Sequence, residues 1–171
     1  MGKRKDKIAY YRKDPSGEYA YIGKYLRWQG DEASYRKELQ IWFASCGLIF
    51  AAHLALGFVT ETGMEGNPFM LIPYAATLLT VILLLWKLVR LWKTKGTIKE
   101  YENDEIVKAI PWFTLFILLF CICEVAGVIQ TFVSHREYLM GKAGFLYPIM
   151  AVFSAFLSYL IFRRRKAWEF G

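Results

Sequence analysis

Four long apolar runs constrain this chain of 171 residues more than any other feature. They cover residues 41–59, 68–86, 109–133 and 143–162, and charged segments separate them. An α-helix needs about 20 residues to cross the roughly 30 Å hydrocarbon layer of a bilayer. The pattern therefore predicts an all-α membrane protein, a four-helix transmembrane bundle with helices over residues 41–59, 68–92, 109–133 and 143–162.

The distribution of positive charge predicts the orientation of this bundle. Of the 22 Lys and Arg residues, ten precede residue 41, six lie in 87–108 and four in 163–166. The other two connections hold only Arg136 and Lys142. Positive residues accumulate on the cytoplasmic side of membrane proteins. We therefore expect a multi-pass integral membrane protein with both termini in the cytoplasm.

Composition narrows the possible functions. The net charge of +7 is explained by this topology and by attraction to anionic lipid headgroups at the cytoplasmic face, so no nucleic-acid partner is expected. The three cysteines, Cys46, Cys121 and Cys123, form no Cys-x-x-Cys pair, which argues against a thiol oxidoreductase. The Ser, His, Cys and carboxylate residues form no familiar nucleophile or metal arrangement, so an enzyme is the third and least favoured function class, and we expect no cofactor.

Residues 1–40 are predicted to form a separate cytoplasmic segment, ahead of a transmembrane domain over 41–162 and a basic tail over 163–171. The turn sequence Asp14-Pro15-Ser16-Gly17 divides two Tyr-rich stretches, which predicts a β-hairpin over about residues 7–25. A helix then leads into the first span. An isolated two-stranded hairpin is marginally stable in water, so we expect its aromatic face to pack on the connection 93–103, on lipid headgroups or on a partner.

The two halves of the chain show a possible duplication. At a shift of 70 residues, Trp42, Phe50 and Gly57 fall on Trp112, Phe120 and Gly127. Such a repeat predicts two helical hairpins of the same orientation, related by an axis along the membrane normal. The alternative is that interfacial aromatic residues and helix-end cations recur by composition alone.

Glu124 and His53 are the residues to which we assign a candidate intramembrane polar or ion site. A carboxylate within a span costs on the order of 2.5–3.5 kcal/mol, and His53 is expected at a similar depth. Helical spacing places Cys46, Gly57 and Thr60 on the stripe of His53, and it places Cys121, Gly127 and Thr131 on the stripe of Glu124. The pair either binds a proton or cation in the course of transport or fixes how two helices dock. A metal site would have no recognised ligand spacing, and none is predicted.

Small residues predict where helices approach closely. Ala151, Ser154, Ala155 and Ser158 form a stripe at helical spacing on the fourth span, and Gly57 and Gly127 are candidates on the first and third. The stripe of the fourth span is expected to be a packing face, either within the bundle or against a second copy.

The sequence favours one function class without naming a substrate. It predicts an accessory or interaction subunit of a membrane assembly, associated with itself or with another membrane protein. The alternative is a small homo-oligomeric transporter or channel with a proton- or cation-linked site at Glu124 and His53.

Overall fold

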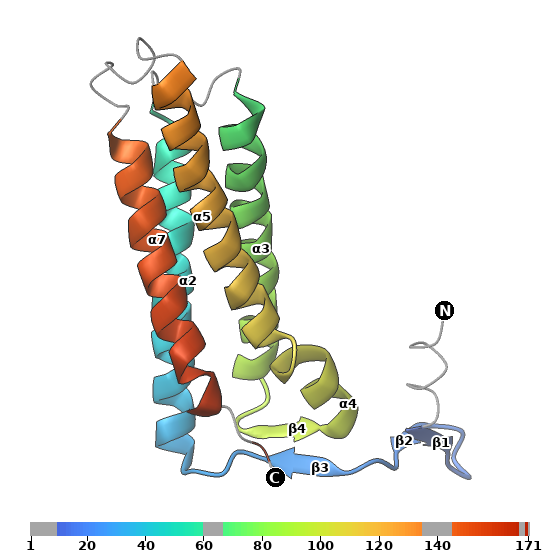
Figure 1. The fold of residues 1–171 in the computed structure, drawn as a ribbon. Coiled ribbons are helices and arrows are strands. Elements are labelled where there is room, and N and C mark those ends of the chain that lie inside the picture. The colour runs from blue at the N-terminus through green and yellow to red at the C-terminus, as the bar shows by residue number, and fades with distance from the viewer. Residues whose placement is uncertain (1–9, 60–66, 135–144, 168–169, 171) are drawn as a thin grey trace.

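The computed structural model describes residues 10–59, 67–134, 145–167 and 170. The protein is mostly helical, and four long helices run side by side (Figure 1). They are α2 (Glu32–Gly57), α3 (Pro68–Trp92), α5 (Ile110–Ser134) and α7 (Leu146–Arg163). Within the described residues these are the four helices long and apolar enough to cross a membrane. The expectation of four long apolar helices is therefore confirmed.

The helix ends follow from local sequence signals. α2 begins well before residue 41 because the side chain of Asp31 accepts a hydrogen bond from the backbone N–H of Ser34, 3.0 Å away, and so caps the helix. α3 begins at Pro68, where a missing N–H costs little, and Asn67 caps it. A short helix α4 (Glu100–Glu102) and a π-helical turn (Asn103–Val107) lead into α5, and a 3₁₀ turn (Arg164–Ala167) follows α7.

The four helices form a square bundle. α3 packs on α2 and α5, and α7 packs on α5 and α2. α2 and α5 therefore face each other across the bundle diagonal. An up-and-down bundle has this arrangement with or without an internal duplication, so the predicted repeat stays a prediction.

The core has two apolar clusters at different heights along the helices. The larger lies toward the end that carries the sheets and includes Trp42, Leu84, Leu88 and Ile117. The smaller lies toward the opposite end and contains Leu56, Met70, Tyr74, Val128 and Tyr147. Along each helix, a buried polar side chain lies between the residues of one cluster and those of the other.

Two small sheets lie at one end of the bundle (Figure 1). β1 (Tyr11–Lys13) pairs antiparallel with β2 (Tyr19–Tyr21) around the turn, where Gly17 adopts φ +90°. β3 (Tyr25–Arg27) pairs antiparallel with β4 (Thr97–Lys99) in the connection between α3 and α4. The hairpin is thus shorter than the predicted 7–25: residues 7–9 lie outside the described residues, and Tyr25 pairs with Lys99 instead.

The aromatic face of the hairpin packs on that same connection. The Lys99 ammonium donates a hydrogen bond to the Tyr11 hydroxyl, 3.1 Å away, and lies 5.1–6.0 Å from the ring centres of Tyr11, Tyr21 and Tyr101. The hydrogen bond to Tyr11 raises the pKa of the Lys99 amine above its ordinary value. The expected contact of the hairpin with the connection 93–103 is therefore present.

Candidate functional site

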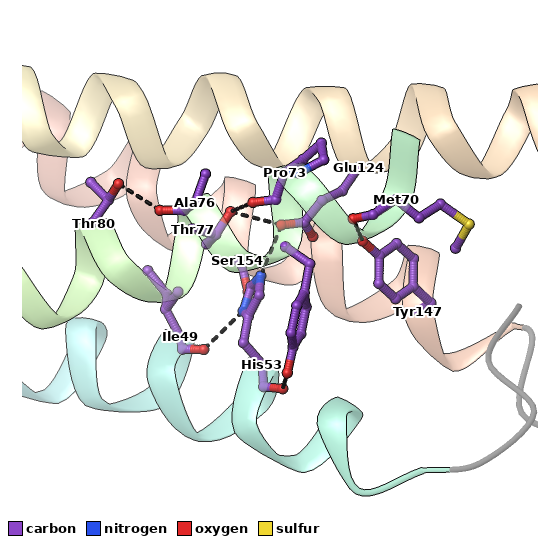
Figure 2. A network of polar contacts seen from close by, with 11 residues as sticks. Ile49, His53, Met70, Pro73, Ala76, Thr77, Thr80, Glu124, Tyr147 and Ser154 are labelled. Carbon is purple, nitrogen blue, oxygen red and sulfur yellow. Dashed lines mark hydrogen bonds and ion pairs between the residues drawn. The ribbon is translucent and has the colours of Figure 1, made fainter. Parts of the chain in front are cut away.

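Each of the four long helices contributes one polar side chain to a layer between the two apolar clusters (Figure 2). These side chains are His53 from α2, Thr77 from α3, Glu124 from α5 and Ser154 from α7, and all four residues are fully buried. We call this set the polar layer. His53 and Glu124 lie at the same height in the bundle and are in contact, although their helices face each other across the bundle diagonal.

The two nitrogens of His53 have different partners. Nδ1 lies 3.0 Å from the carbonyl oxygen of Ile49, one turn earlier, and Nε2 lies 3.2 Å from Oε1 of Glu124. A carbonyl oxygen only accepts hydrogen bonds, so Nδ1 carries a hydrogen. The contact between Nε2 and Oε1 then holds one further proton, which makes the pair either an imidazolium with a carboxylate or a neutral imidazole with a carboxylic acid.

Tyr74 holds the His53 ring in place. Its ring stacks on the imidazole with the centres 5.8 Å apart, and its hydroxyl donates to the backbone carbonyl of His53 at 2.8 Å. A Cβ atom on Gly57 would lie 2.6 Å from that hydroxyl oxygen. The Tyr74 hydroxyl therefore lies close to the backbone of α2 at Gly57.

The two carboxylate oxygens of Glu124 are in different surroundings. Oε1 faces His53 and lies 2.7 Å from the hydroxyl of Thr77, which is also 3.0 Å from the carbonyl of Pro73. Oε2 is buried and has no hydrogen-bond partner among the described residues. A buried carboxylate oxygen without a hydrogen bond lowers the stability of the folded state. Oε2 is therefore the atom of the polar layer that is available to a further ligand or hydrogen-bond donor.

The other candidate residues lie at different distances from the pair. Cys121 is adjacent, since its Sγ, a ring nitrogen of His53 and a carboxylate oxygen of Glu124 all lie within 4.8 Å of one another. Cys46 is buried in the larger apolar cluster. Thr131 lies toward the far end of α5, where it donates to the carbonyl of Gly127 at 2.8 Å and accepts a hydrogen bond from Asn67. Thr60 lies outside the described residues.

The small residues predicted for packing are at helix contacts. A Cβ atom on Gly127 would lie 2.7 Å from the backbone oxygen of Phe69, so α5 approaches α3 closely there. On α7, Ala151, Ser154 and Ser158 are fully buried and Ala155 is partly buried. Ser158 donates to the carbonyl of Thr114 at 2.7 Å, which joins α7 to α5.

Sequence reasoning did not assign Thr77, Tyr74 or Ser154 to the site. Ser154 Oγ lies 3.5 Å from Nδ1 of His53, so a residue predicted only for packing also borders the polar layer. Tyr74 and Thr77 could have been singled out from the sequence by one feature. With Thr80, they place polar groups three residues apart in a mostly apolar run.

No family model, curated protein or solved structure matches this chain. What the site can do chemically therefore follows from its geometry alone. The polar layer brings a base and an acid within hydrogen-bond distance of each other. Beside them lie a thiol and one carboxyl oxygen that has no hydrogen-bond partner among the described residues.

Proposed function

We propose that this chain is a multi-pass membrane protein whose sheet-bearing end faces the cytoplasm. Large apolar side chains are exposed along the long helices, among them Ile72 (67%), Leu79 (59%) and Ile122 (56%). Soluble proteins rarely expose apolar patches on this scale, whereas lipid tails solvate them. Most Lys and Arg residues belong to segments at the end with the sheets, which supports the cytoplasmic orientation of that end.

We further propose that the protein acts as an accessory or interaction subunit of a membrane assembly. The observation that carries this proposal is the arm, which we define as residues 10–22. The arm extends to the side of the bundle base (Figure 1) and is fixed there by the tyrosine rings around Lys99. It still exposes the apolar surface of Tyr19 (70%) and Ile22 (60%). A positioned element with exposed aromatic and aliphatic surface is suited to bind another protein.

A pair of surface variants tests this role. Tyr19→Ser/Ile22→Ser removes the apolar surface of the arm, and Phe58→Ser/Phe145→Ser removes exposed apolar surface, 81% and 67% exposed, at the opposite end as a control. We expect the native mass of wild type and control, extracted from their own membranes with lipid retained, to include a second kind of chain at fixed ratio. The arm variant should lose that chain. A wild-type protein that is monomeric or purely homo-oligomeric would contradict the proposal.

A second candidate function is a small transporter with a proton-linked site. The specific observation in its favour is the contact of His53 Nε2 with Glu124 Oε1, together with the buried Oε2 of Glu124, which has no hydrogen-bond partner in the described part of the chain. Proton flux into vesicles containing the purified protein tests this function. Transport predicts flux in wild type and in Glu100→Gln, which changes a carboxylate outside the polar layer, and loss of flux in Glu124→Gln. Absence of flux in wild type, or equal flux in Glu124→Gln, would rule it out.

A further inference from the structure

Three side chains with three kinds of metal-binding atom converge in the polar layer. The donor atoms are a ring nitrogen of His53, Sγ of Cys121 and a carboxylate oxygen of Glu124, all within 4.8 Å of one another. All three residues are fully buried. We infer that these residues bind a resident divalent transition metal ion of the zinc type. This inference is independent of the role proposed for the arm.

The mixture of ligand atoms indicates the class of metal. Mg²⁺ and Ca²⁺ are bound by oxygen atoms, whereas a thiolate with an imidazole and a carboxylate suits Zn²⁺ and its neighbours in the first transition row. Three protein ligands with a fourth position left for water is a recurring zinc arrangement.

Separations within the group are compatible with tetrahedral coordination. Nitrogen and oxygen ligands at about 2.0–2.1 Å from zinc lie roughly 3.3 Å from each other in a tetrahedron. Nε2 of His53 and Oε1 of Glu124 are 3.2 Å apart. Cys121 is one turn before Glu124 on α5, so the two side chains lie on the same face of that helix.

The atoms behind the ligands are arranged as the outer shell of a metal site requires. A metal-binding histidine usually donates its second ring N–H to a carbonyl or carboxylate, which fixes the tautomer. Nδ1 of His53 donates to the carbonyl of Ile49, which leaves the lone pair of Nε2 for a metal. The hydroxyl of Thr77 lies 2.7 Å from the carboxylate of Glu124, and bound carboxylates are commonly hydrogen-bonded in this way.

Charge balance explains why such an ion would stabilise the polar layer. Oε2 of Glu124 is buried without a hydrogen-bond partner among the described residues, and a buried polar atom that lacks a partner is disfavoured. A divalent ion bound by one carboxylate, one thiolate and a neutral imidazole gives a site with no net charge. The ion replaces the proton shared by His53 and Glu124, and the thiol loses its proton, so binding releases protons to the solvent.

Cobalt(II) is the probe for this site, because its tetrahedral complexes are coloured and its bond to a thiolate gives a near-ultraviolet charge-transfer band. The purified full-length protein is stripped with a chelator and titrated with Co²⁺, and the protein as isolated is analysed for zinc. We expect one metal ion per chain, tetrahedral visible bands and the thiolate band. Absence of zinc in the isolated protein together with an unchanged spectrum on Co²⁺ addition would overturn the inference.

Matched cysteine variants identify the ligand. Cys121→Ser should abolish the thiolate band and weaken metal affinity at least about tenfold. Cys46→Ser, which changes an equally buried cysteine in the larger apolar cluster, should retain both. A thiolate band that survives Cys121→Ser would contradict the assignment.

A measurement on wild type alone keeps the test decisive if a variant does not fold. A ligand that binds only the folded state raises the melting temperature. Zn²⁺ should raise the melting temperature of the stripped protein, and Mg²⁺ at the same concentration should leave it unchanged. Equal effects of the two ions, or no effect of Zn²⁺, would refute a selective site.

Discussion

Glu124 and His53 depend on each other because neither side chain reaches water. Both residues are fully buried, and the contact between Nε2 and Oε1 is 3.2 Å. Removing one member of a buried pair leaves the other without compensation, at a cost of about 3–5 kcal/mol, whereas replacing both by apolar groups is often tolerated. The pair therefore joins α2 to α5 across the diagonal, whether it holds a proton or a metal ion.

A double-mutant cycle measures this dependence in metal-free protein. We expect His53→Phe and Glu124→Leu each to lower the free energy of unfolding in detergent micelles, and the double variant to lose about 1–3 kcal/mol less than the sum of the single variants. Coupling of this size would show that the two side chains interact in the folded state.

A more distant residue provides the control for this cycle. Thr131→Val combined with His53→Phe should be additive within about 0.5 kcal/mol, because Thr131 bonds to Gly127 and Asn67 instead. Additivity between His53 and Glu124 as well would contradict the contact.

The sequence predicted the members of this pair and not their surroundings. A charged and a titratable residue within apolar runs are visible without a structure, and counting along the helices gives their approximate depth. The rotation of each helix is set by packing across the bundle, which the sequence does not show. The spacing of metal ligands along the sequence gave no signal either, because Cys121 and His53 lie on different helices. The convergence of His53, Cys121 and Glu124 could therefore not be derived from the sequence.

At the scale of elements, the contact between α3 and α5 depends on Gly127. A Cβ atom there would lie 2.7 Å from the backbone oxygen of Phe69, so a methyl group has to push the two helices apart. We expect Gly127→Ala to lower the free energy of unfolding by about 1–3 kcal/mol. Chemical denaturation in detergent micelles measures this loss.

Gly47 provides the matched control for that substitution. It lies within α2, and a Cβ atom on it would meet no atom within 4 Å. Gly47→Ala should therefore cause no loss beyond about 0.5 kcal/mol. Equal stability of Gly127→Ala and wild type would show that the close approach of α3 and α5 is not needed.

The long helices were predictable as elements, and the strand pairing was only partly so. Residues 68–92 coincide with α3, which begins at Pro68 and continues past the end of the apolar run at residue 86 to Trp92. The turn Asp14–Gly17 predicts a local hairpin by its residue types. In contrast, Tyr25–Arg27 pairs with Thr97–Lys99, far along the chain, and neither segment carries a local signal for that partner.

For the whole molecule, we propose that the four long helices cross a bilayer with both sheets on one side. The lengths of the apolar runs predicted the helices, and the orientation expected from the charge distribution stays a prediction. The square arrangement follows from packing that no single helix sequence encodes, since every long helix has apolar residues around most of its surface. Orientation in a membrane is the property on which the proposed arm and its partner depend.

The most direct test labels cysteines introduced one at a time with a membrane-impermeant maleimide in intact cells, while Cys46 and Cys121 stay buried. Phe58→Cys and Phe145→Cys lie at the end opposite the sheets and Gln29→Cys lies at the sheet end, each in a background that carries Cys123→Ser because Cys123 is exposed. We predict that Phe58→Cys and Phe145→Cys react in intact cells and that Gln29→Cys reacts only after permeabilisation. Reaction of Gln29→Cys in intact cells would contradict the four-span topology. Reaction of only one of Phe58→Cys and Phe145→Cys in intact cells would also contradict it.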